Sequence, residues 1–270
     1  VLGKDDPELT EVVRKQFAAD GVDIRAQTAV TKIEKDGDKI VVVTEKDGQT
    51  ERIAGSHLLV AAGRTPNLDG LNLEAAGVTY ERRGIEVDAR LRTTNKKIFA
   101  IGDVAGPYQF THMAGYHAGI VIRNALFKLP AKVNYSAVPW VTYTDPELAH
   151  VGMTEADAEK AHPGAINILR WPFHENDRAQ AERETEGLIK VVTTKKGRVL
   201  GATIAGPHAG ELLSPWIMAV GTKQKIGAMA GMIAPYPTLG EVGKRAAGSY
   251  YTPSLFSERT RKIVRFLLKF

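Results

Sequence analysis

Residues 97–103 read Lys-Ile-Phe-Ala-Ile-Gly-Asp, and this stretch carries the strongest indication of the fold. A continuous apolar run closed by glycine is typical of a strand that is buried on both faces of a parallel sheet. Residues 57–62, closed by Gly63, have the same character. We therefore predict buried strands at 57–62 and 97–101, both belonging to an α/β sheet.

Asp103 follows the second of these strands and is a candidate ligand-binding residue. An acidic side chain at the carboxyl end of a buried strand can accept hydrogen bonds from the hydroxyl groups of a ligand. The helix expected from about Thr111 to Phe127 would direct N–H groups and the positive end of its dipole at a negatively polarised atom. The spacing leaves open that Asp103 only caps a helix or completes a turn, and that residues 63–66 form a plain turn.

Helices and antiparallel strands are expected on either side of these two runs. Asp6 and Pro7 begin a helix whose apolar residues recur at helical spacing until Gly21 ends it. Short strands are expected at 22–24, 29–34, 40–44 and 51–53, and turns at Asp36-Gly37-Asp38 and Asp47-Gly48 connect the last three as antiparallel strands. A short helix ends at Gly77. Beyond 130–134, strands at 138–143, 148–152 and 165–171 and a hairpin of strands at 187–194 and 198–205 alternate with helices from Thr154, at 209–220 and at 239–247. A parallel sheet needs earlier strands and crossovers, and none precede Val1, so we expect the chain to begin within a domain.

The composition argues against several classes of function. The 270 residues are 43% hydrophobic and 25% charged, with a net charge of +5 that is spread along the chain. Without a basic stripe interleaved with aromatic residues, this charge argues against a nucleic-acid partner. Cysteine is absent, which excludes disulfides, thiolate metal sites and cysteine nucleophiles within this chain. No apolar run reaches membrane-spanning length and no signal peptide is present, so we expect a cytoplasmic protein without integral membrane association.

The histidines do not have the spacing of a metal site. His112 and His117 are five residues apart, whereas a helical metal pair needs i, i+4 spacing, and the other histidines are isolated. Near the C-terminus, basic and apolar residues alternate from Arg259 to Lys269. We expect a helix that docks on its own domain or on a partner, and a helix on a membrane surface is the alternative.

Three motifs in a fixed order resemble those of a known family. They are VAAGRTPN at 60–67, IFAIGD at 98–103 and TDPELAHVG at 144–152. Their succession is similar to that in the FAD-dependent pyridine nucleotide–disulfide oxidoreductases, which include dihydrolipoamide dehydrogenase, glutathione reductase and mercuric reductase. The implied fold is the remainder of Rossmann-like α/β nucleotide-binding domains followed by an α+β dimerisation domain.

The resemblance also implies domain boundaries. Residues 1–66 would be the C-terminal part of an NAD(P)-binding domain, and residues 67–133 the returning segment of an FAD-binding domain. Residues 134–270 would be the dimerisation domain of a homodimer.

The resemblance assigns cofactor-binding roles to five residues. Gly102 and Asp103 are implied to bind FAD, with Asp103 on the ribityl chain. Thr111 would begin a helix whose N–H groups face the pyrimidine end of the isoalloxazine and stabilise the reduced flavin. Val30 and Gly63 match positions that line the nucleotide of NAD(P)H.

The catalytic pair implied by the resemblance falls at Tyr236 and Glu241. The family's glutamate is kept, but tyrosine stands where dihydrolipoamide dehydrogenases and glutathione reductases have histidine. An imidazole titrates near neutral pH, whereas a phenol with an unperturbed pKa of ~10 does not, so ordinary dithiol–disulfide exchange is in doubt. Tyrosine near glutamate resembles the mercuric reductases, although the vicinal cysteine pair at their C-terminus is absent. Packing of Tyr236 between prolines at an interface is the alternative.

We accordingly expect the C-terminal region of a flavoprotein oxidoreductase. It would pass electrons from NAD(P)H through FAD to a disulfide or thiol-bound acceptor, as in a mercuric reductase. The chain contains neither a G-x-G-x-x-G loop nor a C-x-x-x-x-C pair, so we expect it to be inactive by itself. A non-catalytic dimerisation or interaction module is the alternative.

Overall fold

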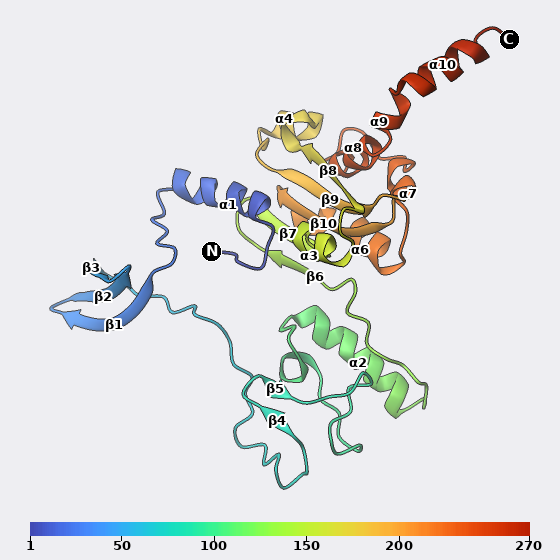
Figure 1. Cartoon of the computed structure of the whole chain (residues 1–270). Helices are drawn as coiled ribbons and strands as arrows, with labels where there is room; N and C mark the ends of the chain where they lie inside the picture. Colours follow the sequence, from blue (N-terminus) through green and yellow to red (C-terminus); the bar gives the residue numbers. More distant parts are fainter. The chain divides into compact units, whose positions relative to one another are not determined.

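The computed structural model describes all 270 residues, which form two compact units. One unit combines residues 1–27 with residues 136–270, and the other comprises residues 28–135 (Figure 1). The predicted division at residues 66 and 133 remains a prediction.

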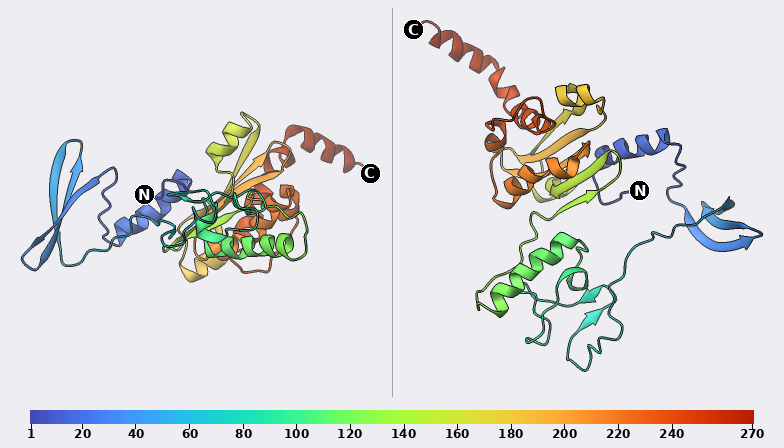
Figure 2. Two further views of the ribbon diagram at one scale, coloured as in Figure 1. Left: turned by 90° about the horizontal axis from the view of Figure 1, so that it is seen from below. Right: turned by 180° about the vertical axis from the view of Figure 1, so that it is seen from behind.

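A five-stranded antiparallel sheet is the centre of the first unit. Its strands are β6 (Pro139–Thr142), β7 (Glu147–Gly152), β8 (Ile166–Pro172), β9 (Leu188–Thr194) and β10 (Val199–Gly206). Their order in the sheet is β6-β7-β10-β9-β8, and β9 and β10 form the predicted hairpin. Figure 2 shows helices on both sides of this sheet.

Successive residues of a strand point to opposite faces of the sheet, and different helices cover the two faces of this sheet. On one face, Ile189 and Ile204 pack in a large core with Trp216 and Val242 of the following helices. On the other face, Leu148 and Ala205 pack against α1. The helices of this unit are α1 (Pro7–Ala19), α3 (Glu155–Ala161), α4 (Asp177–Glu182), α5 (Ala209–Leu212), α6 (Ser214–Gly221), α7 (Ile226–Ala230), α8 (Glu241–Ser249), α9 (Thr252–Leu255) and α10 (Glu258–Leu267), with a 3-10 turn η2 (Phe173–Glu175).

Two of the predicted helix starts are capped by a side chain. Asp6 caps α1, since its Oδ1 accepts the N–H of Glu8 at 3.0 Å, and Thr154 caps α3. The single helix predicted at 209–220 is wrong, because two helices occur there. Pro215 lies at the start of the second, where a proline without an N–H is tolerated.

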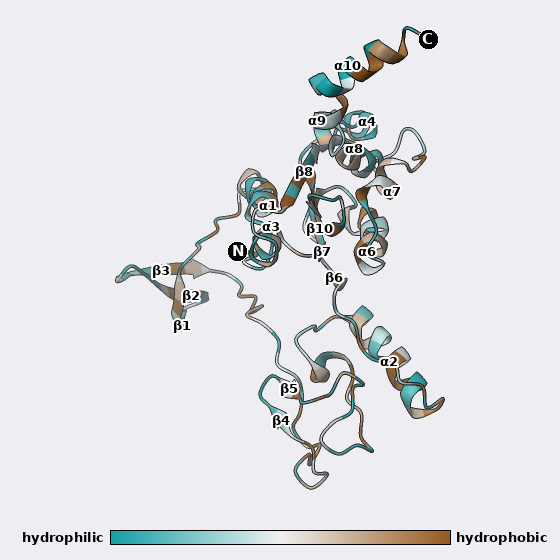
Figure 3. Ribbon diagram, turned by 45° about the vertical axis from the view of Figure 1, so that its right-hand side comes forward, coloured by the Kyte–Doolittle hydropathy of each residue, from teal (hydrophilic) through white to brown (hydrophobic).

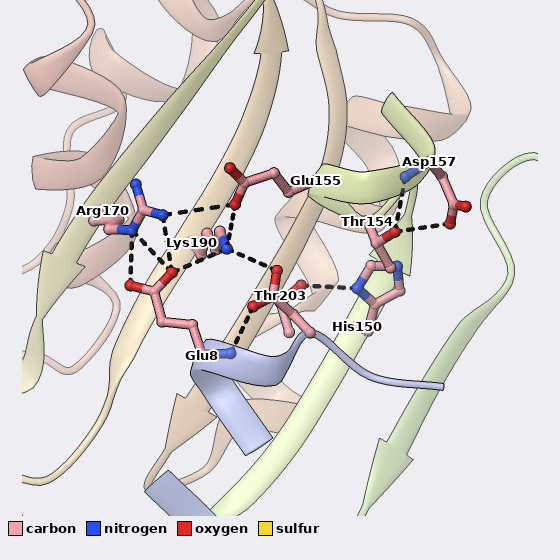
Figure 4. Close-up of polar contacts among 9 residues, drawn as sticks. Glu8, His150, Thr154, Glu155, Asp157, Arg170, Lys190 and Thr203 are labelled. Carbon is pink, nitrogen blue, oxygen red and sulfur yellow. Dashed lines mark hydrogen bonds and ion pairs between the residues drawn. The ribbon is translucent and has the colours of Figure 1, made fainter. Parts of the chain in front are cut away.

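Lys190 lies in the middle of β9, on the face that α1 and α3 cover, and is nearly fully buried. Its Nζ lies 2.8 Å from Asp6 Oδ2 and 2.9 Å from Glu8 Oε2, and it also pairs with Glu155. Glu8 additionally receives hydrogen bonds from Arg170 on β8 (Figure 4). Burial alone lowers the pKa of Lys190, but the three carboxylates outweigh it and raise the pKa. The cluster fastens α1 and α3 to the sheet.

The second unit contains two small sheets and one long helix. Strands β1 (Ala29–Asp36), β2 (Lys39–Lys46) and β3 (Gln49–Gly55) form the predicted antiparallel meander. The remaining elements are β4 (Tyr80–Glu81), β5 (Gly84–Ile85), the 3-10 turn η1 (Gly102–Ala105) and α2 (Thr111–Ala125).

The strand predicted at 57–62 is wrong. These residues have no strand partner, and the side chains of Leu59 and Val60 are 88% and 70% exposed. An apolar run becomes a buried strand only where neighbouring strands accept its backbone hydrogen bonds, and no strand of this chain lies beside it.

The strand predicted at 97–101 is also wrong. Phe99 forms only an isolated bridge with Arg92, and Ala100 donates its N–H to Leu91 across a narrow loop. Ile101 is 39% exposed, because this segment has a partner on one side only. The strand predicted at 22–24 and the short helix ending at Gly77 do not form either; the latter is a hydrogen-bonded turn.

The predicted fold class is nevertheless confirmed. The second half of the chain is an α+β domain, and helices and sheets are mixed throughout the chain. No helix has both the length and the apolar character needed to cross a bilayer.

We expect Lys190→Met to destabilise the first unit by about 3–5 kcal/mol, because it leaves the buried carboxylate of Asp6 without its cation. Urea unfolding followed by tryptophan fluorescence measures this, since all three tryptophans (Trp140, Trp171 and Trp216) belong to that unit.

The matched control is Arg178→Gln, which removes an exposed ion pair with Glu182 on α4. It should cost less than about 0.5 kcal/mol. Equal unfolding midpoints for the two variants would refute the role given to Lys190.

Candidate functional site

Gly102 and Asp103 begin the turn η1, as the motif at 98–103 requires. Gly102 is buried with φ +68°, and a Cβ on it would lie 3.1 Å from the Cβ of Ala114 on α2. Glycine is therefore needed both for the backbone conformation and for the close approach of α2. The side chain of Asp103 is exposed and available to a ligand.

His117 of α2 is hydrogen-bonded to the backbone of this turn. The N–H of Gly102 donates to His117 Nδ1 at 3.1 Å, so the ring proton lies on Nε2, which donates to Tyr135 Oη at 3.0 Å. Burial lowers the pKa of His117 and keeps the ring neutral. The prediction that His117 is a core residue rather than a metal ligand agrees with these contacts.

Thr111 is the first residue of the 15-residue helix α2 and is exposed. The preceding residue, Phe110, makes no side-chain capping hydrogen bond. An uncapped helix start presents N–H donors and a positive dipole end to an anion. The start of α2 therefore has the free N–H donors that the predicted binding of a negatively polarised atom requires.

Arg64, the residue after Gly63, is hydrogen-bonded to the segment that precedes α2. Arg64 donates from Nη2 to the carbonyl oxygen of Gln109 at 2.8 Å, two residues before α2 begins. Gly63 itself has φ +123° and no atom within 4 Å of a Cβ built on it, so its backbone is open to a ligand. This hydrogen bond connects the residue after Gly63 to the segment that precedes Thr111.

Val30 does not share any of these contacts. It lies on β1, at the edge of the three-stranded sheet, and is 61% exposed. Its proposed place beside the nucleotide of NAD(P)H remains a prediction.

Tyr236 and Glu241 lie close enough to interact, on the loop before α8 and at its first residue. Tyr236 is 69% exposed, and its hydroxyl donates to Asp177 Oδ2 at 2.9 Å. Packing of its ring between prolines at an interface remains a prediction. The pKa of Tyr236 is raised, first by this hydrogen bond and further by the negative charges of Asp177 and Glu241. The phenol is therefore held in its protonated form.

The tyrosine loop is fixed by the residue next to Asp177. Asn176 is buried, donates from Nδ2 to the carbonyl oxygen of Thr238 at 3.1 Å, and caps α4 through Oδ1. Two consecutive residues of the α4 start therefore hold the loop and orient the phenol. Neither was found from the sequence, because Asp177 is 59 residues from Tyr236 and no motif relates them.

The residues present fit a flavin better than a metal. An exposed aspartate and an uncapped helix start suit the hydroxyls and the negative pole of a reduced flavin, whereas no group of three or more histidine, aspartate and glutamate side chains could hold a metal ion.

The sequence matches two family models. Residues 1–118 match "Pyridine nucleotide-disulphide oxidoreductase", and residues 138–247 match "Pyridine nucleotide-disulphide oxidoreductase, dimerisation domain".

Similar proteins include two enzymes of bacilli. The chain is 37% identical to mercuric reductase of Bacillus cereus over 244 residues, which cover 89% of the chain and 38% of that enzyme. It is 34% identical to dihydrolipoyl dehydrogenase of Geobacillus stearothermophilus over 251 residues, 92% of the chain and 53% of that enzyme. The chain therefore spans about half the length, or less, of these relatives.

A solved structure with the same fold is the HOCl-induced flavoprotein disulfide reductase RclA of Escherichia coli. It superposes with a TM-score of 0.83 at 28% sequence identity, over 92% of this chain and 56% of that one.

We expect stability to fall with pH below 6.5, because two histidines are held neutral. His150 on β7 accepts from Thr203 and donates Nε2–H to the carbonyl of Gly152, and burial lowers its pKa as it does for His117. A depressed pKa means that the unfolded chain binds more protons, so stability is complete above the unfolded value of 6.5 and declines below it.

Unfolding midpoints between about pH 7.5 and about pH 5 test this, since the carboxylate Glu8, whose pKa is lowered from 4.5 mainly by Arg170, stays ionised there. Ring resonances of both histidines should titrate at a pH below the unfolded value of 6.5. A midpoint that does not change with pH, or normal titration of both rings, would contradict the assignment.

Proposed function

Since this chain belongs to the FAD-dependent pyridine nucleotide–disulphide oxidoreductase family, we propose that it is the C-terminal part of a flavoenzyme. The whole protein passes electrons from NAD(P)H through FAD to a disulfide or thiol-bound acceptor, in the manner of the mercuric reductases. The observation that carries this proposal is the hydrogen bond from the hydroxyl of Tyr236 to Asp177, on the loop that precedes Glu241.

FAD, when bound, supplies the two-electron relay between nicotinamide and acceptor. Asp103 would accept hydrogen bonds from its ribityl hydroxyls, and the α2 terminus at Thr111 would stabilise negative charge on the reduced ring. Gly63 and Val30 would line the nicotinamide nucleotide. Gly102 lets Asp103 project from η1 and accommodates α2.

Tyr236 would donate its one O–H to the leaving thiolate of the acceptor in place of Asp177, which accepts this O–H in the structure. A thiolate bound to a metal or to a second sulfur is a better leaving group when an O–H donates to it. Asp177 keeps that proton on the phenol, and Glu241 adds to the effect. A histidine would instead exchange its proton near neutral pH, as dithiol exchange requires.

The dimerisation domain supports a homodimer in which this pair faces the partner subunit. The cytoplasmic location and the absence of a nucleic-acid partner remain predictions. The alternative, a non-catalytic dimerisation module, is favoured for the isolated chain by the exposed run around Leu59 and by the lack of cysteine.

We expect the purified 270-residue chain to contain no stoichiometric flavin and to lack NAD(P)H oxidation activity. Its flavin-facing residues form only one part of a binding surface, and residues 57–62 have no strand partner. The measurement is the absorbance spectrum of the chain. Stoichiometric flavin absorbance would overturn this expectation without bearing on the role of Tyr236.

In the whole protein, Tyr236→Phe should lower turnover with a thiol-bound acceptor about 100-fold while the flavin spectrum stays unchanged, because the ring is kept and only the proton is lost. Asp177→Asn should move the alkaline limb of the pH profile to lower pH, since the carboxylate raises the tyrosine pKa.

The matched control is Tyr143→Phe, at a tyrosine that is 81% exposed and lies after β6. It should leave turnover unchanged. Equal turnover rates for Tyr236→Phe and the parent would refute the role proposed for Tyr236.

A further inference from the structure

The C-terminal helix α10 has no place in the core of its unit. It runs from Glu258 to Leu267, and Ser257 caps it by accepting the N–H of Thr260 at 3.3 Å. None of its residues is buried, although the rest of the unit packs on both faces of the sheet. Figure 1 shows α10 at the end of α9, extending away from the sheet that the other helices cover. The prediction that it docks on its own domain is therefore wrong.

The helix has two chemically distinct faces. Ile263, Leu267 and Phe270, at i, i+4 and i+7 spacing, belong to an apolar stripe. Four of the five basic residues of the segment lie on the opposite face, and Arg259 lies on the apolar side. The exposed apolar residues of the segment are Phe256, Ile263, Val264, Phe266, Leu267, Leu268 and Phe270. The basic residues are Arg259, Arg261, Lys262, Arg265 and Lys269, and Glu258 is the only acidic one. In Figure 3 the beginning of α10 is hydrophilic and its end hydrophobic.

The apolar stripe is too exposed to be an ordinary protein surface. Phe266 and Leu267 are 60% and 61% exposed, and Leu268 and Phe270 are 80% and 95% exposed. A contiguous apolar patch rimmed by charge marks a surface that binds something. A helix of 10 residues cannot span a bilayer, which needs about 20.

The basic charge of α10 favours one of the two partners that could cover its apolar stripe, a second copy of the helix or a lipid surface. If α10 paired with a second α10 through the apolar stripe, the basic face of each helix would point outward without an opposite charge to pair with. An anionic lipid surface offers both an apolar layer for the stripe and negative headgroups for the basic face.

We propose that α10 is a peripheral anchor that binds anionic membranes. The helix lies in the plane of the interface, with Phe266, Leu267 and Phe270 among the upper acyl chains. Arg261, Lys262 and Arg265 contact the phosphate groups. This assignment does not depend on the proposed redox function.

The test is binding of the intact chain to vesicles of phosphatidylcholine with or without phosphatidylglycerol, measured by co-sedimentation. Because the chain has no cysteine, Leu268→Cys carries a single environment-sensitive dye that reports insertion. We expect binding to the phosphatidylglycerol vesicles only, a blue shift of the dye, and release at high salt.

Two variants separate the contributions of charge and apolar surface. Replacing Arg261, Lys262 and Arg265 by glutamine should lower the partition coefficient on the order of 100-fold. Phe266→Ser with Leu267→Ser should lower it by at least about tenfold. Because α10 contributes no buried side chain, tryptophan-monitored unfolding of both variants should match the parent.

The matched control removes the same charge elsewhere, by glutamine at the exposed Lys35, Lys39 and Lys46 of β1 and β2. It should bind like the parent. Failure of the parent to bind, equal binding to neutral vesicles, or an equal loss in the control would overturn the proposal. So would light scattering in which the serine variant converts a lipid-free dimer into a monomer, because a second copy would then cover the stripe.

Discussion

Neutralisation of Lys190 by three carboxylates is the interaction on which the arrangement of the first unit depends. A cation in the middle of a covered strand is tolerated only if its charge is paired there, and the partners come from two helices, α1 and α3. Asp6 holds Lys190 with one oxygen and caps α1 with the other. The beginning of the helix and its docking on the sheet are therefore set by a single side chain.

A buried neutral side chain holds the backbone next to each of two candidate site residues, and the candidate side chain itself is exposed. His117 accepts the N–H of Gly102 and leaves Asp103 facing outward, while Asn176 holds the loop that carries Tyr236. Polar groups that are buried and satisfied rigidify their surroundings, which is what an exposed ligand-binding side chain needs behind it.

Sequence reasoning succeeded where structure is local and failed where it depends on distant partners. The cap at Asp6, the Asp-Gly turns of the meander and the β9–β10 hairpin follow from neighbouring residues. The apolar run at 57–62 was misjudged because a strand exists only if others pair with it. Asp177 and Lys190 carried no recognisable pattern, since their partners lie 59 and 184 residues away. The motifs located Asp103 and Tyr236 but not the residues that hold them in place.

The span between Asp6 and Lys190 also has a consequence for biosynthesis. The two residues are separated by 184 positions, so α1 leaves the ribosome long before the strand that binds it exists. At ~5–20 residues per second, the helix waits roughly 10 to 40 s with Leu9 and Val13 uncovered. During that interval the nascent chain presents an apolar surface that only chaperones can shield, and the last strands to be made determine when the first helix becomes stable.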